Sequence, residues 1–207
     1  ARGGVGSKGA HTRDKDFTEY IYPATMHQTM LFFTKKGRCY WLHCYDIPEG
    51  EKTSKGRAIQ NLLNIDPGDS VNAFLRLRGR GLENEEFVNS HYVVFATKNG
   101  TVKKTSLKEY SRPRTNGVIA INIAEGDEVV DVRLTNGRNE LILADRNGRA
   151  VRFDEADIRT MGRTATGVRG MRLDGGDDAV VGMIGVNDAS KESVMVVSEE
   201  GYGKRSE

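Results

Sequence analysis

Lysine and arginine residues recur at matching positions along this chain, and this spacing is the feature of the sequence that could support chemistry. They follow a turn glycine in several similar segments and gather again around a second glycine signal. Charges repeated in this way suit contact with the phosphates of a nucleic acid. The positions are Arg38, Lys55, Arg57, Lys103, Lys104, Arg112, Arg114, Arg149, Arg152, Arg163, Arg169, Lys204 and Arg205.

The bulk charge of the chain does not by itself indicate a polyanion partner. There are 31 basic and 29 acidic residues, so the net charge is only +2. A basic surface must therefore come from segregation of the charges. If the repeats stack radially, equivalent positions share one rim, and the acidic turns form a separate surface. Such a basic rim suggests contact with the backbone of bent nucleic acid. The alternative is that lysine and arginine simply cover exposed strands.

Similar segments must position these residues, and each is built around a turn. The clearest runs from Phe95 to Leu107, with an apolar run, then Asn99-Gly100, then a basic strand. Asn-Gly between β-prone runs predicts a hairpin with a type I′ turn. The turn glycines repeat roughly every 50 to 60 residues, a period typical of propellers or repeat arrays. They are Gly37, Gly100, Gly148 and Gly201.

Each repeat continues with an irregular stretch, the second glycine signal, an apolar strand, an acidic turn and a closing strand. In the second repeat, Ser106 and Glu109 form a capping-box pair that predicts one helical turn. Residues 118–123 and 129–134 read as strands around an acidic turn, and residues 58–63 are the equivalent apolar strand of the first repeat. Four strands per repeat predict a propeller-type blade.

These patterns predict one all-β domain that is divided into blades. The expected boundaries are 1–23 for the end of one blade, 24–75, 88–134 and 139–185 for three blades, and 192–207 for the start of another. Residues 79–86 are an insertion that we expect to be a surface loop. No apolar run approaches the length of a membrane span.

Other candidate chemistry is weakly supported. Gly4-x-Gly6-x-x-Gly9 lacks the strand and helix that a dinucleotide site needs, and no phosphate-binding loop motif occurs. Cys39, His43 and Cys44 are too few for a zinc site, so we expect no metal site and no catalytic residue. The two cysteines are five apart on a predicted strand and point to opposite faces, which argues against a disulfide. Tyr40 and Trp41 are expected in the core or between blades.

Several segments carry a resemblance to a known family. They are Gly100-Thr101-Val102-Lys103-Lys104-Thr105, Thr166-Gly167-Val168-Arg169-Gly170-Met171-Arg172-Leu173 and Gly201-Tyr202-Gly203-Lys204-Arg205, together with Gly56-Arg57 and 59–63. Over nearly the whole chain except 79–86, they resemble the C-terminal domain of the DNA gyrase A subunit. The resemblance implies a β-pinwheel, a propeller-like fold of four-stranded blades. This chain would be a fragment of a six-bladed domain.

The N-terminal residues carry a second resemblance to the same family. Arg2, Gly3, Gly4 and Gly6 look like the remainder of the gyrase A box, Gln-Arg-Arg-Gly-Gly-Lys/Arg-Gly. Ala1 stands where an arginine is usual and Val5 where a base is usual, and we expect Lys8 to supply the missing charge. Because the box separates gyrase from topoisomerase IV, the C-terminal domain of the topoisomerase IV A subunit stays an alternative. A protein-interaction propeller is a second one.

The resemblance implies that the chain binds, bends and wraps duplex DNA without sequence specificity around the basic rim, including Arg2 and Lys8. The whole enzyme would be a type II topoisomerase that introduces negative supercoils with ATP. This chain would carry no active site and no cofactor, since ATP and Mg²⁺ act through other domains. Its partners would be the rest of the A subunit together with the B subunit, in an A2B2 assembly in the bacterial cytoplasm and without a membrane.

Overall fold

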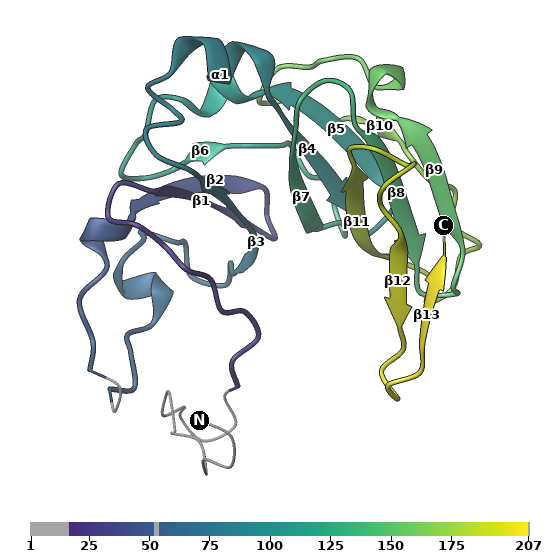
Figure 1. The fold of residues 1–207 in the computed structure, drawn as a ribbon, viewed down its shortest axis with the longest axis horizontal. Helices are drawn as coiled ribbons and strands as arrows, with labels where there is room; N and C mark the ends of the chain where they lie inside the picture. The colour runs from purple at the N-terminus through teal and green to yellow at the C-terminus, as the bar shows by residue number, and fades with distance from the viewer. Residues whose placement is uncertain (1–16, 52–53, 207) are drawn as a thin grey trace.

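The chain forms antiparallel β-sheets that follow one another along an arch (Figure 1). The computed structural model describes residues 17–51 and 54–206. This arrangement confirms the all-β prediction. No helix in these two described ranges is long and apolar enough to cross a membrane.

The first two sheets have four strands each. The first has the order β3-β1-β2-β6, from β1 (Thr29–Thr34), β2 (Arg38–His43), β3 (Val71–Leu77) and β6 (Val118–Ile119). The second has the order β10-β5-β4-β7, from β4 (Tyr92–Thr97), β5 (Thr101–Ser106), β7 (Val129–Thr135) and β10 (Val168–Arg169).

The last two sheets are smaller. The third has the order β11-β8-β9, from β8 (Glu140–Asp145), β9 (Ala150–Asp154) and β11 (Val180–Val186). The fourth is a hairpin of β12 (Val194–Val197) and β13 (Gly203–Ser206). Short 3-10 helices connect the strands, namely η1 (Cys44–Asp46), η2 (Ile59–Asn61), η3 (Leu107–Tyr110) and η4 (Glu155–Asp157).

The fourth strand of each complete sheet comes from the following repeat. β6 of the second repeat pairs with β2 of the first, with Cys39 opposite Val118. β10 of the third repeat pairs with β5 of the second in the same way, with Val102 opposite Val168. The four strands of one repeat are therefore shared between two sheets. The strand predicted at 58–63 is wrong, because these residues form η2, and the described residues hold no preceding sheet for them to join.

The hairpin turns share one geometry from repeat to repeat, but they are not type I′. Gly100 N donates to Thr97 O over 3.0 Å, and Ala96 pairs with Val102, so the loop has three residues. This is a type I turn followed by a left-handed residue, Gly100, at φ +88°. The Thr97 hydroxyl oxygen also accepts from Thr101 N at 3.1 Å. Thr34, Asp145 and Ser198 accept equivalent bonds in the other repeats.

The core lies between neighbouring sheets. Phe33 of the first sheet meets Phe95 of the second edge to face, with ring centroids 5.3 Å apart, and both are fully buried. A second cluster, including Val94, Leu141 and Met183, joins the second sheet to the third. Trp41 Nε1 donates to Tyr110 O at 2.9 Å and Tyr40 is buried, which confirms the expected core and inter-blade positions of these two aromatics.

The acidic turns do not form a separate surface as expected. Because β1 is antiparallel to both β2 and β3, the hairpin turn and the start of β3 lie at the same end of the sheet. Asp69 Oδ1 therefore accepts from Lys36 N at 3.2 Å, and Asp127 Oδ1 accepts from Asn99 N at 2.9 Å. Each acidic turn supports the neighbouring basic hairpin.

Local details agree in part with the sequence. The predicted helical turn is confirmed as η3, and the Ser106 hydroxyl caps it by accepting from Lys108 N at 3.4 Å. The predicted loop at 79–86 is instead partly helical at its end, because α1 (Glu85–Ser90) begins inside it with Asn84 as the N-cap. Cys39 and Cys44 are free thiols.

Candidate nucleic-acid interface

The arch has an inner and an outer edge, and the outer edge carries the candidate interface. β3, β7 and β11 contact one another along the inner side (Figure 1), whereas β6 and β10 lie at the opposite edges of their sheets. We call residues 111–117 and 158–167, which lead to β6 and β10, the outer crossovers. The segment 54–58 is the equivalent connection of the first repeat in the sequence.

Backbone hydrogen bonds hold the end of each outer crossover on the preceding sheet. Ala120 N donates to Gly37 O at 2.8 Å, and Gly170 N donates to Gly100 O at 2.8 Å. There is no room for a side chain at this junction, since a Cβ on Gly100 would lie 2.5 Å from Met171 O. The turn glycine thus serves both the hairpin and the docking of the next repeat.

Exposed basic side chains gather on the outer crossovers and near them. They make no hydrogen bond or ion pair with any residue in the described part of the chain, so they are available to an anionic partner. Of the predicted residues, this group contains Lys55, Arg57, Arg112, Arg114 and Arg169, and Lys204 and Arg205 on β13 share these properties.

The structure contradicts the predicted phosphate contacts of Lys103 and Lys104. Lys103 is 0% exposed, and its Nζ donates to Ala120 O and Arg163 O, each at 2.5 Å. Burial, together with Arg163, lowers the pKa of Lys103 to about 7. The physical reason is that β5 packs on the core with one face while an outer crossover covers the other. Neither lysine reaches the outer surface.

Lys104 belongs to a buried polar network instead. Its Nζ lies 3.5 Å from Glu155 Oε2 and donates to Glu155 O at 3.2 Å. Thr135 Oγ1 donates to Glu155 Oε2 at 2.6 Å, and Asn139 N donates to Oε1 at 2.8 Å. Both charges are therefore hydrogen-bonded, as buried ions must be. The network joins the second repeat to the third.

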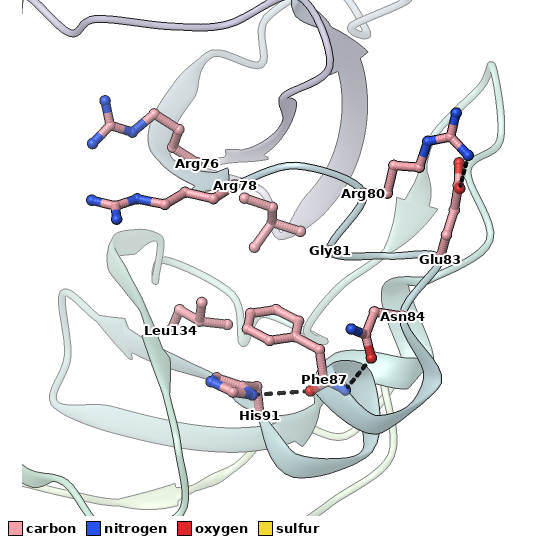
Figure 2. Close-up of a pocket in the computed structure, with 10 residues that line it drawn as sticks. Arg76, Arg78, Arg80, Gly81, Glu83, Asn84, Phe87, His91 and Leu134 are labelled. Atoms are coloured by element: carbon pink, nitrogen blue, oxygen red, sulfur yellow. Dashed lines mark hydrogen bonds and ion pairs between the residues drawn. The ribbon is translucent and has the colours of Figure 1, made fainter.

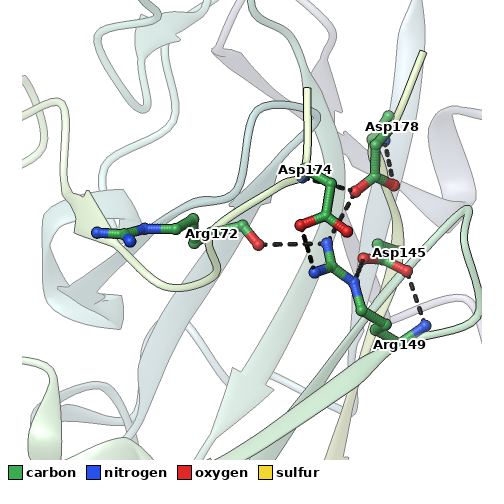
Figure 3. A network of polar contacts seen from close by, with 6 residues as sticks. Asp145, Arg149, Arg172, Asp174 and Asp178 are labelled. Carbon is green, nitrogen blue, oxygen red and sulfur yellow. Dashed lines mark hydrogen bonds and ion pairs between the residues drawn. The ribbon is translucent and has the colours of Figure 1, made fainter. Parts of the chain in front are cut away.

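Arg149 is the centre of a network of ion pairs at the surface (Figure 3). Its Nε donates to Asp145 at 2.8 Å, its Nη1 to Asp174 at 2.8 Å, and its Nη2 to Asp178 at 3.0 Å. The side chains of Asp145 and Asp178 are fully buried. Three carboxylates offset the charge of this guanidinium, whose side chain is 41% exposed, and the DNA contact of Arg149 stays a prediction.

Three further predicted residues are partly engaged within the protein, two through polar contacts and one through burial. Arg38 donates to Asn116 O at 2.7 Å, which ties the first sheet to an outer crossover. Arg152 is paired with Glu140 on the surface. Arg163 is half-buried, and its Nε has no hydrogen-bond partner among the described residues.

The sequence analysis missed Arg159. Its side chain is exposed on an outer crossover and makes no hydrogen bond or ion pair within the described ranges. A signal was present, because Arg159 follows η4 at the same interval as Arg112 follows η3. Arg2, Gly3, Gly4, Gly6 and Lys8, the predicted box residues, lie outside the described residues.

Comparisons with known proteins agree with this architecture. A family model described as the DNA gyrase C-terminal domain, beta-propeller, matches residues 28–78, 91–136, 139–187 and 192–207. The DNA gyrase A subunit of Salmonella typhimurium is 44% identical over 204 residues, which is 99% of this chain and 22% of that protein. The DNA gyrase A subunit of Haloquadratum walsbyi is 36% identical over 206 residues, which is 100% of this chain and 24% of that protein.

Solved structures share the fold. The C-terminal domain of a DNA topoisomerase IV has a TM-score of 0.72 at 32% identity, over 87% of this chain and 53% of that one. A DNA gyrase A C-terminal domain has a TM-score of 0.70 at 20% identity, over 95% of this chain and 63% of that one, and supports the fold alone. The resemblance seen in the sequence is confirmed: the chain belongs to the DNA gyrase C-terminal domain family, a β-pinwheel of the propeller type.

Proposed function

We propose that this chain binds duplex DNA through the outer crossovers and wraps it along the outer edge of the arch. The observation that carries the proposal is that unpaired, exposed basic side chains recur on equivalent connections of successive repeats. Arg112, Arg114 and Arg159 represent two such connections. A row of cations on a curved edge suits a polyanion that must bend to follow it.

The contacts should read the phosphate backbone and not the bases. The only α-helix in the described ranges, α1, has 6 residues and packs against η3, which has 4. No element of the outer edge is thus suited to enter a major groove. Smooth bending of a site of about 20 to 30 base pairs costs on the order of 1 to 6 kcal/mol. Several phosphate contacts must offset this cost, which requires the crossovers to act together.

We further propose that the chain serves as the C-terminal domain of a gyrase A subunit in the bacterial cytoplasm. The chain spans 22% of the Salmonella typhimurium relative. DNA cleavage and ATP hydrolysis would then be supplied by the rest of the A subunit together with the B subunit, in an A2B2 assembly. The identity of 36% to 44% to gyrase A subunits over nearly the whole chain supports this choice. The isolated chain should neither hydrolyse ATP nor cleave DNA.

Duplex binding as a function of salt tests the interface. A double variant, Arg112→Gln with Arg114→Gln, should flatten the slope of log K against log salt by about 1.8, from roughly 0.9 per phosphate contact. The control is Arg138→Gln with Lys191→Gln, which removes two exposed charges, one of them paired with Asp188, from connections that leave the inner strands. Equal slopes for the two double variants, or a thousandfold preference for one sequence, would refute the proposal.

Wrapping needs a separate readout from binding. A nicked circle sealed by ligase in the presence of the chain should keep a change in linking number after the protein is removed. The change should fall in the crossover double variant and persist in the control. A chain that binds DNA and leaves the linking number unchanged would support binding without wrapping, and it would favour the protein-interaction alternative for the rest of the edge.

A further inference from the structure

A cavity lies between the first two repeats, and Figure 2 shows the residues that line it. It encloses about 610 Å³, which is in the usual range for small-molecule sites. The end of β3 and the segment that follows it form one side, and α1 and β7 form the other. We call this cavity the linker pocket. Its lining residues are Arg76, Leu77, Arg78, Arg80, Gly81, Glu83, Asn84, Phe87, His91 and Leu134.

The floor of the linker pocket is apolar and partly aromatic. Leu77 is 1% exposed, and Phe87 and Leu134 are half-buried. The imidazole of His91 stacks on the Phe87 ring, with centroids 3.9 Å apart and planes 25° from parallel. A flat ring that enters the pocket can therefore contact an aromatic surface that is already held in place.

The rim of the linker pocket is cationic on one side. Figure 2 shows the guanidinium groups of Arg76 and Arg78 extending in the same direction, whereas Arg80 points away towards Glu83. Arg80 is paired with Glu83 at 3.6 Å. Arg78 has no hydrogen bond or ion pair with the described residues, so its charge is uncompensated there.

Arg76 is held in place beside Arg78. Its Nη1 donates to Pro23 O at 2.8 Å, and its guanidinium carbon lies 5.0 Å from the centre of the Tyr22 ring. These contacts leave other N–H groups of the guanidinium available. Two guanidinium groups on one side, with a single donor bond spent on a neutral carbonyl, favour an anionic group between them.

His91 adds a specific polar group. Its Nδ1 lies 3.0 Å from Phe87 O and 3.1 Å from Ser90 Oγ, and in the tautomer that donates to the carbonyl, Nδ1 carries the hydrogen. In the neutral imidazole, Nε2 is then an acceptor, and Figure 2 shows it on the side of the ring away from this bond. The pocket therefore combines a cationic rim, an aromatic wall and one acceptor.

We propose that the linker pocket binds a small organic anion built on a flat ring. The ring would lie against Phe87 and Leu134, and the anionic group, a carboxylate or a phosphate, would lie between Arg76 and Arg78. A mononucleotide and a simple aromatic acid both have this chemistry. The inference does not rest on the DNA interface, because none of these residues belongs to the outer crossovers.

Calorimetric titration of the 207-residue chain, with adenosine 5′-monophosphate, adenosine, 1-naphthoate and inorganic phosphate as separate probes, tests the proposal. We expect at least one of the two ring-bearing anions to bind at least about tenfold more tightly than adenosine and inorganic phosphate. The methyl resonances of Leu77 and Leu134 should shift on its addition. Tighter binding of the monophosphate would assign the site to nucleotides, and tighter binding of 1-naphthoate to aromatic acids.

Variants separate the linker pocket from general attraction of anions. Arg78→Gln should weaken the better ring-bearing anion about tenfold or more, and Phe87→Leu should weaken it while retaining an apolar side chain. Arg138→Gln, which removes an exposed charge elsewhere, should bind as the parent chain does. The proposal is overturned if Arg78→Gln and Arg138→Gln bind equally well, if inorganic phosphate binds as tightly as the ring-bearing anions, or if neither of these anions binds at millimolar concentration.

Discussion

The ammonium group of Lys103 lies 2.5 Å from the carbonyl oxygen of Ala120, on the segment that docks on the preceding sheet. The same group donates to Arg163 O on the next outer crossover. One buried side chain thus joins two segments of the second repeat to the third repeat. Its two hydrogen bonds hold these segments together, and the amine is not available to a ligand on the outer edge.

The pH dependence of stability should reveal this buried lysine. Burial and Arg163 lower the pKa of Lys103 to about 7 in the folded state, against roughly 10.4 in an unfolded chain. Between these values the unfolded state binds more protons, so the free energy of unfolding rises with pH. We expect Lys103→Met to lose this rise between pH 7 and 8.5, where one proton contributes at most about 1.4 kcal/mol per pH unit.

Urea unfolding at a series of pH values measures this effect. Lys108→Met is the matched control, because Lys108 is exposed on η3, the connection that follows β5. The interpretation is wrong if the parent chain and Lys103→Met have parallel pH profiles.

Two turn glycines allow the docking of the next repeat to be measured apart from backbone strain. Gly100 and Gly148 have similar positive φ values of +88° and +83°. A Cβ on Gly100 would lie 2.5 Å from Met171 O, whereas a Cβ on Gly148 would meet none of the described atoms within 4 Å. In each alanine variant, strain in the left-handed conformation should lower the free energy of unfolding by about 1 to 2 kcal/mol. Gly100→Ala should lose about 1 to 3 kcal/mol more from overpacking.

Chemical denaturation of the two alanine variants gives the comparison. Equal losses of stability would show that the contact between Gly100 and Met171 contributes nothing measurable.

Arg149→Gln should destabilise the fold without weakening DNA binding. The substitution leaves the buried carboxylates of Asp145 and Asp178 without their cation, which should cost about 1 to 3 kcal/mol at neutral pH. Burial alone would raise the pKa of Asp145, but hydrogen bonds from the Arg149 amide and guanidinium lower it below its usual value. A carboxyl group whose pKa is lowered in the folded state stabilises the fold above its unfolded pKa near 3.9. This contribution to the free energy of unfolding is lost as the pH falls through the folded pKa.

The loss caused by Arg149→Gln should therefore shrink below about pH 4. Thermal unfolding from pH 7 to pH 3 tests this, with Arg146→Gln, an exposed neighbour, as the control. A flatter salt dependence of DNA binding in Arg149→Gln at a temperature where it is folded would instead return Arg149 to the interface.

Arg159→Gln should reduce the salt slope of duplex binding as much as Arg112→Gln does, by about 0.9. The two arginines follow equivalent 3-10 helices and are both exposed. Fluorescence anisotropy of a labelled duplex from low to moderate salt measures the slopes, beside Arg138→Gln. A slope for Arg159→Gln equal to that of Arg138→Gln would remove Arg159 from the interface.

The features that were predicted correctly from the sequence are local ones. The hairpins follow from glycines flanked by apolar and β-prone residues, and the helical turn after Ser106 follows from its cap. The exposed arginines at 112 and 114 sit in a segment without apolar residues to bury. Each of these properties depends on a few neighbouring residues, and such properties can be read from one sequence.

The burial of Lys103 could not be predicted in this way. Residues of β5 alternate between two faces, and one face is covered by a crossover whose Arg163 is 60 positions away. The ion pairs of Arg149 also depend on an acidic turn 25 to 29 residues later. Strand exchange between repeats has the same character, because the short strand of 118–119 pairs with residues from another repeat. No local pattern in the sequence specifies these partners.

The pairing of β6 and β10 with the sheet of the preceding repeat has a mechanical consequence. An outer crossover is anchored at one end in its own repeat and at the other on the preceding sheet, through bonds such as Ala120 N to Gly37 O. A force that pulls on Arg112 or Arg114 is therefore transmitted to two sheets. Neither sheet can unfold without releasing its neighbour, so nearest-neighbour coupling in this array is strong. Under tension the arch should deform as one stiff body, without independent rotation of its blades.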